Sequence, residues 1–451
     1  MPRLSLAALR EALKPTPARL TAGMLVTIAA SLLWGVAATF TVVDRLSAAN
    51  DMVATTGPLS LYAQRIYQSL SDADATEAAA FLAVTEPPAA RAEFHADIER
   101  AGTYLQEVTA ADPPAAARSD LTTLQTELPE YTLLIGEAKA DSAEGLPVGA
   151  SYLQEASYLM RGRILPAADD LYRRENARLA SSYGKATGFP VIAVIVAALC
   201  SILLLRVQRW LASRTRRTLN RGLAAASLVG ALSLTWLLVS FFVASTSLTA
   251  AHDHGTAAAQ PLVQAEITAL RAHADESLTL INRSGDDPNE ADFRLAEKQL
   301  GPGRETLLSK AKAAGIGSPG YRRATAAGSA ATAWYAVHRA VRKLDDRSDY
   351  PDAVYLAIGS GAAGSRAVIG KQEALLTAQS GPGHPATSAA AFAAVETDLT
   401  RGIDADYALF TASASRGDGA LGGVAILMVI ASLLMAAGCA WGLTQRIAEY
   451  R

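Results

Sequence analysis

The chain has 451 residues, of which half are apolar but only 6% are aromatic, and its formal net charge is −2 at pH 7. Alanine, a strong helix former of small volume, recurs throughout and favours long helices over sheets. The two cysteines, Cys200 and Cys439, each lie inside an apolar run, which excludes a disulfide framework and a zinc cluster. We therefore expect an all-α chain without a metal or a cofactor.

Four stretches without a charged residue have about the length of a membrane-crossing helix, roughly 20 residues. These expected spans are residues 20–43, 189–205, 222–249 and 420–443. Buried core helices are the alternative, but a soluble domain rarely tolerates four such stretches without polar faces. We expect Arg206 and Arg209 to extend the short second span by reaching the membrane surface with their charged ends.

The first span could also be a cleavable signal peptide, because Val36-Ala37-Ala38 offers small residues. Its uncharged length of 24 residues favours an uncleaved anchor instead. The sequence leaves open whether this span is cleaved.

Positive charge gathers in three short segments beside the spans, at residues 1–19, 206–221 and 444–451. They hold twelve basic and two acidic residues, whereas the two long segments, 44–188 and 250–419, hold 29 basic and 41 acidic residues. Cytoplasmic flanks of membrane spans keep positive charge. We therefore expect a cell-membrane protein with a cytoplasmic head, middle loop and tail, and with both long segments outside the membrane.

The first long segment, residues 44–188, has the pattern of a four-helix bundle. Its apolar residues step by threes and fours in stripes that begin at Leu59, Phe94 and Leu121, and a fourth helix is expected over residues 148–183. Prolines and glycines separate these stripes at residues 87–88, 113–114 and 145–147. Four antiparallel helices return the chain to the membrane, and we expect the fourth to run into the following span.

The second long segment, residues 250–419, repeats this plan. Its first stripe begins at Val263, and breaks are expected at residues 286–288 and 317–320. Glycines and prolines at residues 359–361 and 381–385 interrupt the last arm, which we expect to be longer and looser. As in the first segment, we expect the last helix to continue into a span.

Short matches between the long segments favour a duplication. Ile66, Ala73 and Asp74 correspond at one constant offset to Ile267, Ala274 and Asp275, and Pro147 with Tyr152-Leu153 resembles Pro351 with Tyr355-Leu356. The alternative is two unrelated helical loops. The duplication predicts two bundles of one design.

The layout of a span, a helical bundle and a second span resembles the sensor domains of bacterial chemoreceptors and histidine kinases. The doubled layout, with QRIYQSLSDADAT at residues 64–76 and Arg214-Thr215-Arg216-Arg217 between the inner spans, resembles the GlnX-type membrane proteins of actinobacteria. The resemblance implies a relay between an amino-acid-binding lipoprotein outside and a serine/threonine kinase inside. Chemoreceptors bind ligands through bundle arginines, and Arg65 is the nearest candidate by position.

The catalytic and metal-binding candidates all have simpler interpretations. His252-Asp253-His254 offers two metal ligands where zinc and copper sites usually need three or four, so we interpret it as a solvated flank. The glycines from Gly359 to Gly364 lack the lysine of a phosphate loop. No nucleophile motif or kinase signature is present, and we expect no catalytic residue and no enzyme activity.

The middle loop carries the residues that we expect to meet a cytoplasmic partner or lipid: Arg209, Arg214, Arg216, Arg217 and Arg221. Each basic residue near an anionic leaflet contributes about 1 kcal/mol to membrane contact. Nucleic-acid binding is not expected of so short a tethered segment. The expected cytoplasmic segments are too short to fold alone, so we expect any signal to pass to a separate partner.

Three functions fit this layout to different degrees. The leading hypothesis is a signal relay that senses amino-acid availability. A homodimer of this chain is one assembly that the hypothesis allows. The second is an envelope scaffold without ligand sensing. The third, a transporter subunit, fits worst because the spans carry no charged residue to line a path. The ligand and its contact residues stay open.

Overall fold

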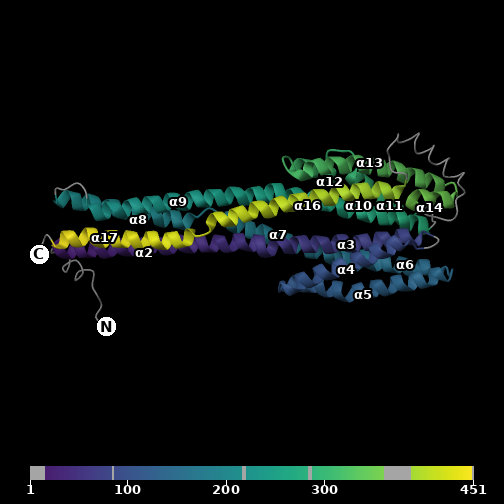
Figure 1. The fold of residues 1–451 in the computed structure, drawn as a ribbon, viewed down its shortest axis with the longest axis horizontal. Coiled ribbons are helices and arrows are strands. Elements are labelled where there is room, and N and C mark those ends of the chain that lie inside the picture. Colours follow the sequence, from purple (N-terminus) through teal and green to yellow (C-terminus); the bar gives the residue numbers. More distant parts are fainter. Residues whose placement is uncertain (1–15, 84–85, 216–219, 283–286, 360–386, 449–451) are drawn as a thin grey trace. The chain divides into compact units, whose positions relative to one another are not determined.

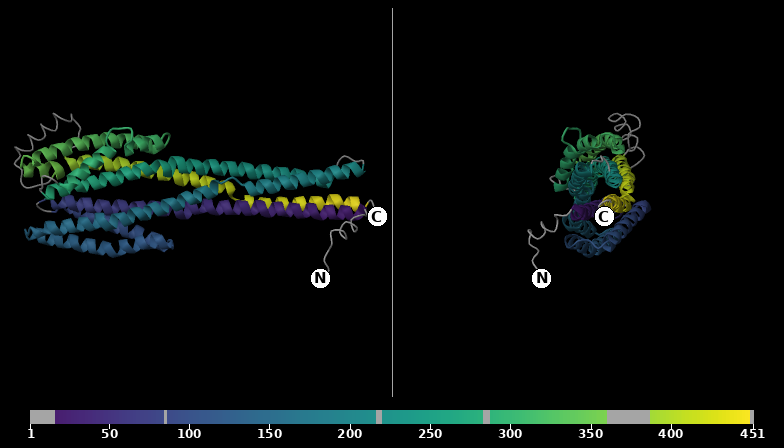
Figure 2. Two further views of the ribbon diagram at one scale, coloured as in Figure 1. Left: turned by 180° about the vertical axis from the view of Figure 1, so that it is seen from behind. Right: turned by 90° about the vertical axis from the view of Figure 1, so that its left-hand side faces the viewer.

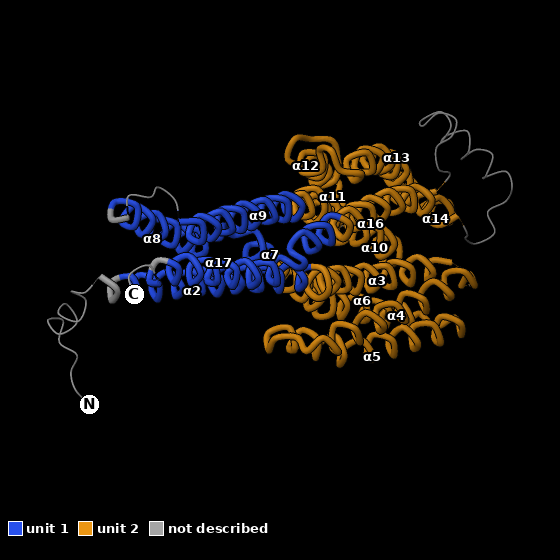
Figure 3. The backbone as a smooth tube through the Cα atoms, turned by 60° about the vertical axis from the view of Figure 1, so that its left-hand side comes forward, with its two compact units in different colours: residues 1–52, 182–249, 413–451 blue, residues 53–181, 250–412 orange. Residues whose placement is uncertain are grey.

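A computed structural model describes residues 16–83, 86–215, 220–282, 287–359 and 387–448. Every regular element in these ranges is a helix, which confirms the all-α fold class (Figure 1). The chain forms two compact units (Figure 3). Unit 1 comprises residues 1–52, 182–249 and 413–451, and unit 2 comprises residues 53–181 and 250–412.

Unit 1 contains the four expected spans. Its helices are α2 (Thr16–Asp51), α8 (Val191–Thr215), α9 (Arg221–Ala251) and α17 (Val424–Ala448). All four lie in helical stretches that are long and apolar enough to cross a membrane. The chain is therefore a multi-pass membrane protein.

Small residues let the spans of unit 1 approach closely. A Cβ on Gly222 of α9 would lie 2.4 Å from the Cα of Gly442 on α17. Asn220 donates from Nδ2 to the carbonyl oxygen of Gly442 at 2.7 Å. Trp34 of α2 is 1% exposed and donates to Ser233 Oγ at 3.3 Å. Close packing and buried polar contacts thus hold the spans together.

The first and third spans continue into unit 2 without a break in helical conformation. Helix α2 passes through the π-helical turn η1 (Met52–Thr56) into α3 (Gly57–Phe81). Helix α9 passes through η3 (His252–Thr256) into α10 (Ala257–Asn282). Each π-helical turn follows directly on a span helix, close to the boundary between the units.

The second and fourth spans are instead separated from the preceding helix, where we had expected continuity. Helix α7 (Leu165–Thr187) ends three residues before α8, because Pro190 cannot continue the helix. Helix α16 (Ser388–Leu421) ends two residues before α17, at Gly423 with φ of 75°. Arg45 donates from Nε and Nη2 to the carbonyl oxygen of Gly188, at 3.0 and 2.7 Å. It thus supplies hydrogen bonds to a carbonyl group just after the end of α7.

The first long segment supplies helices on one side of unit 2 (Figures 1 and 2). After α3 come α4 (Pro88–Ala110), α5 (Ala115–Ala143), α6 (Val148–Leu159), the π-helical turn η2 (Met160–Ile164) and α7. The expected breaks at 113–114 and 145–147 lie between helices, and α4 begins at Pro88. Helix α5 continues through Pro129.

The second long segment forms α10, α11 (Pro288–Leu300), α12 (Leu307–Ala314), α13 (Pro319–Asp345), α14 (Tyr350–Ile358) and the start of α16. Helix α11 begins beside Asp287, whose Oδ1 accepts from the backbone N of Asn289 at 2.9 Å. Helix α13 begins at the expected break, and α14 ends at Gly359, whose φ is 74°. The expected breaks at residues 360–361 and 381–385 lie outside the described residues.

Both long segments contribute to one hydrophobic core in unit 2. Helix α3 packs directly against α10. The largest fully buried side chains of this core include Tyr67, Tyr131, Phe293 and Trp334. The prediction that the two long segments form two bundles of one design is not tested by this shared core. The shared core brings matching helices of the two segments side by side.

Candidate functional site

The interface between α3 and α10 carries a ladder of buried polar contacts, which we call the central seam. At one step Gln64 donates from Nε2 to Glu266 Oε2 at 3.1 Å, and Gln68 donates to Glu266 Oε1 at 3.2 Å. Thr400 of α16 donates to the same Oε1 at 2.6 Å. Burial raises the pKa of Glu266 to about 7, so this carboxyl titrates near neutrality.

At the next step of the central seam an arginine meets a tyrosine. Arg271 of α10 donates from Nε to the hydroxyl of Tyr67 on α3 at 2.6 Å, and its guanidinium carbon lies 5.6 Å from the Tyr67 ring centre. The contact combines a hydrogen bond with a cation–π interaction. Tyr67 is almost fully buried, so this step ties the two helices inside the core.

The last step of the central seam joins three helices through one guanidinium. Arg161 of η2 bonds from Nη1 to Asp275 of α10, and its Nε lies 3.6 Å from Oδ2 of Asp74 on α3. Ser157 donates to the same Asp74 oxygen at 2.9 Å. Burial raises the pKa of both aspartates, that of Asp275 to about 6, and Arg161 opposes the rise. The cation is what allows both carboxylates to stay charged.

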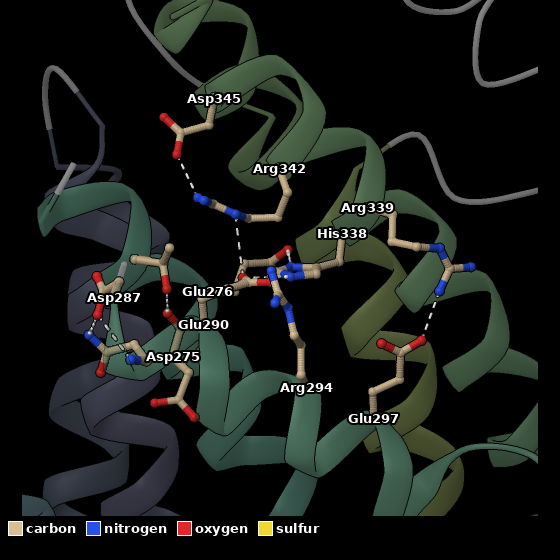
Figure 4. Close-up of polar contacts among 12 residues, drawn as sticks. Asp275, Glu276, Asp287, Glu290, Arg294, Glu297, His338, Arg339, Arg342 and Asp345 are labelled. Carbon is tan, nitrogen blue, oxygen red and sulfur yellow. Dashed lines mark hydrogen bonds and ion pairs between the residues drawn. The ribbon is translucent and has the colours of Figure 1, made fainter. Parts of the chain in front are cut away.

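A second buried network lies within residues 250–412 (Figure 4). His338 of α13 has Glu276 Oε1 2.8 Å from Nδ1 and Glu290 Oε2 3.2 Å from Nε2. Burial disfavours the charged ring, but these hydrogen bonds outweigh it and raise the pKa of His338. Burial also opposes ionisation of Glu276, and its histidine partners outweigh this and lower its pKa to about 2. The network is therefore a charged bridge inside the core.

A polar cleft of about 490 Å³ opens between α3, α4 and α16. This volume falls within the range of small-ligand sites. Charged residues of both signs line the cleft, namely Arg65, Asp72, Glu93, Arg100, Glu396 and Arg401. Arg65 is paired with Asp404, and Arg100 with Asp97. The cleft borders the central seam, because Gln68 and Thr400 belong to both.

The arginines predicted to meet a cytoplasmic partner belong to unit 1. Arg209 lies exposed on α8, and Arg221 lies exposed at the start of α9. Arg214 is in the last turn of α8, and Arg216 and Arg217 lie outside the described residues. The proposed contact itself stays a prediction.

The expected solvated flank, His252-Asp253-His254, lies in the π-helical turn η3. Asp253 and His254 are exposed, and His252 is partly buried with Nδ1 3.3 Å from Thr256 Oγ1. Within the described part of the chain, no three His, Cys, Asp or Glu side chains are grouped so as to hold a metal ion.

Sequence reasoning missed the central seam and the buried histidine network. Asp74 and Asp275 are part of the short sequence match between the two long segments, but an aspartate beside an apolar stripe is normally exposed to solvent. Its burial depends on Arg161, which is more than 80 residues away and on another helix. Arg65, the candidate that resemblance suggested by position, does line the cleft.

Residues 48–184 match the family model described as Actinobacterial sensor domain. The match covers the last residues of α2, then η1, α3 to α6, η2 and most of α7, and therefore one side of the central seam. No curated protein and no solved structure matches the chain. This part of the chain is thus similar to an actinobacterial sensor family, and a sensing role is indicated.

Proposed function

We propose that this protein is a transmembrane signal relay. In this proposal unit 2 lies outside the cell membrane and senses a ligand or a ligand-loaded binding protein, and the Arg-rich middle loop lies in the cytoplasm. The signal passes to a separate cytoplasmic partner, such as a serine/threonine kinase, and the protein itself catalyses no reaction. The sensor-family match over residues 48–184 and the four apolar helices support this assignment.

One observation carries the proposal: the two helices joined by the central seam are the two that continue from spans. Helix α3 continues α2, and helix α10 continues α9, each through a π-helical turn. Such turns are frequent at functional sites in helices. A change in how α3 and α10 pack is therefore a change in two helices that reach into the membrane unit.

The amplitude needed for such a relay is small. Helix shifts of about 1 to 2 Å are a known switching movement. A ligand that draws Gln68 away from Glu266 would break a hydrogen bond between α3 and α10, and one that draws Thr400 away would break a hydrogen bond between α16 and α10. The polar cleft places such a ligand within reach of both residues.

The resemblance to GlnX-type proteins suggests amino-acid availability as the signal. It also suggests a solute-binding lipoprotein as the outer partner and a kinase as the inner one. The exposed Arg209 and Arg221 supply positive charge for contact with the inner partner or with anionic lipid.

Affinity capture tests the relay. The full-length chain is purified in mild detergent from cells grown with amino acids and from cells starved of them, and retained proteins are identified by mass spectrometry. We expect a solute-binding lipoprotein and a serine/threonine kinase, with an amount of bound kinase that changes with amino-acid supply. A retained set of envelope-assembly proteins that does not change with supply would overturn the relay and favour a scaffold.

A further inference from the structure

The loop that joins α12 to α13 exposes two large apolar side chains at one end of this helix pair. Ile316 lies in the loop and is 68% exposed, and Tyr321 lies in the first turn of α13 and is 43% exposed. A single exposed apolar residue is common on a protein surface. Two that lie together at the end of a helix pair indicate a surface that is covered by something other than water.

Hydrogen bonds hold this loop in one conformation. The backbone N of Ser318 donates to the carbonyl oxygen of Gly315 at 2.8 Å. Asp406 of α16, which is 0% exposed, accepts from the backbone N of Gly320 at 2.9 Å and from Ser318 Oγ at 3.5 Å. The exposed Ile316 is therefore presented by a loop that is tied to α16.

The loop lies beside the helix that carries the third span into unit 2. A Cβ on Gly317 would lie 3.9 Å from Cε1 of His254, in η3. Side chains on a helix lean toward its N-terminus, which for His254 is the direction of the span helix α9. The uncharged run of residues 222–249 covers about 42 Å of helix, the thickness of a bilayer with its headgroups. His254 follows about 8 Å further along, so the loop is within reach of lipid headgroups.

The charge around the loop is positive. Residues 307–324 contain four basic residues and no acidic residue. Lys310 and Arg322 are exposed, and Lys312 is partly exposed in the last turn of α12. The connection between α4 and α5 carries instead an aspartate, Asp112, whose side chain is 92% exposed. Apolar and tyrosine side chains next to basic residues are typical of segments that lie in a membrane interface.

We propose that the α12–α13 loop is a lipid-binding site of unit 2. Ile316 and Tyr321 enter the headgroup region of the leaflet from which α9 emerges, and Lys312 and Arg322 pair with the phosphates of anionic lipids. The contact follows α9 and is therefore the same whichever side of the membrane unit 2 faces. It holds the start of α13, and through Asp406 a part of α16, at the lipid surface. This inference goes beyond the proposed relay, because it gives unit 2 a direct contact with lipid.

Fluorescence quenching in lipid nanodiscs tests the proposal. The full-length chain with Ile316→Cys is labelled with the fluorophore NBD and placed in nanodiscs of phosphatidylcholine and phosphatidylglycerol. The native Cys200 and Cys439 are buried, and the wild-type chain treated with the same reagent supplies the background. We expect lipids that carry a spin label on the headgroup to quench the NBD fluorescence, and iodide in the buffer to quench it little.

The matched control is Leu146→Cys, which places the same label at an exposed apolar residue far from the spans. Leu146 is 44% exposed in the connection between α5 and α6. Helix α3 leaves the first span, α4 returns along it, and the 29 residues of α5 then lead away again over about 43 Å. We expect iodide to quench the label at residue 146, and the spin-labelled lipids not to. The proposal is overturned if the label at residue 316 behaves like the label at residue 146.

A charge reversal tests the contact with lipid phosphates. In the labelled Ile316→Cys chain, Lys312→Glu combined with Arg322→Glu should reduce quenching by the spin-labelled lipids and increase quenching by iodide. The control reverses two exposed basic residues at the far end of α13, Lys343→Glu combined with Arg347→Glu, and should leave both unchanged. Unchanged quenching in the first double variant, or an equal loss in both, would overturn the pairing of this loop with anionic lipid.

Discussion

Asp74 and Asp275 occupy matching positions on the first helices of the two long segments, and both contact the guanidinium of Arg161. Each aspartate is 3% exposed. One cation from the first long segment therefore joins the first helices of both segments. The strength of this junction can be tested directly.

Arg161→Ala should destabilise the protein by about 3–5 kcal/mol, because it leaves two buried carboxylates without a counter-charge. The measurement is the free energy of unfolding of unit 2, from chemical denaturation of the full chain in detergent. Arg163→Ala is the control: Arg163 is 65% exposed and pairs with Glu127, and its loss should cost at most about 1 kcal/mol. Equal losses in the two variants would show that the junction does not hold the seam.

The His338 bridge predicts a pH-dependent contribution to stability. Its folded-state pKa is raised above its unfolded value, so the contribution is fully present below about pH 6.5 and is lost as pH rises through the folded pKa. His338→Gln should therefore destabilise the protein most at mildly acid pH, and the difference from wild type should shrink as pH increases. Unfolding measured from pH 6 to pH 9 checks this. A difference that grows with pH would show that His338 is buried neutral.

The continuous helices predict where an insertion uncouples the relay. Two glycines inserted after Thr256, between η3 and α10, should remove the dependence of captured kinase on amino-acid supply, because they interrupt the continuous helix that joins α9 to α10. The control is the same insertion between Gly422 and Gly423, where the helix is already interrupted. Loss of the response in the control alone would place the coupling in the fourth span instead.

Two glycine substitutions in the spans should differ in their effect on stability, because only Gly222 lies at a close contact between helices, that of α9 with α17. Gly222→Ala should destabilise the protein, because its Cβ would lie 2.4 Å from the Cα of Gly442. Gly23→Ala should be neutral or stabilising by up to about 1 kcal/mol, because its Cβ would meet no atom within 4 Å beyond its own stretch of helix and alanine favours a helix. Thermal unfolding of the full chain in detergent measures both. Destabilisation by Gly23→Ala alone would contradict this packing.

Much of the fold followed from the sequence, because apolar length and helical periodicity are local signals. The four spans, and breaks such as the one before Pro319, appear where expected. The second and fourth spans were expected to continue the preceding helices, α7 and α16. Pro190 and Gly423 instead interrupt the helix just before each span. The fourth span begins at Val424 rather than Ala420 for this reason.

The candidate site could not be derived in the same way. The central seam joins residues about 200 positions apart, such as Tyr67 and Arg271, and no local pattern marks such a pair. The cleft is likewise assembled from α3, α4 and α16. Polar residues beside apolar stripes carry the site, and only tertiary packing distinguishes them from solvated ones.

The proposed relay requires unit 2 and the Arg-rich middle loop to lie on opposite sides of the membrane. Ser119, Ser329 and Ser213 are exposed and can be replaced singly by cysteine, while the native Cys200 and Cys439 are buried. A membrane-impermeant maleimide should label Ser119→Cys and Ser329→Cys in intact cells, and Ser213→Cys only after the membrane is permeabilised. Labelling of Ser213→Cys in intact cells together with either of the other two would contradict the account.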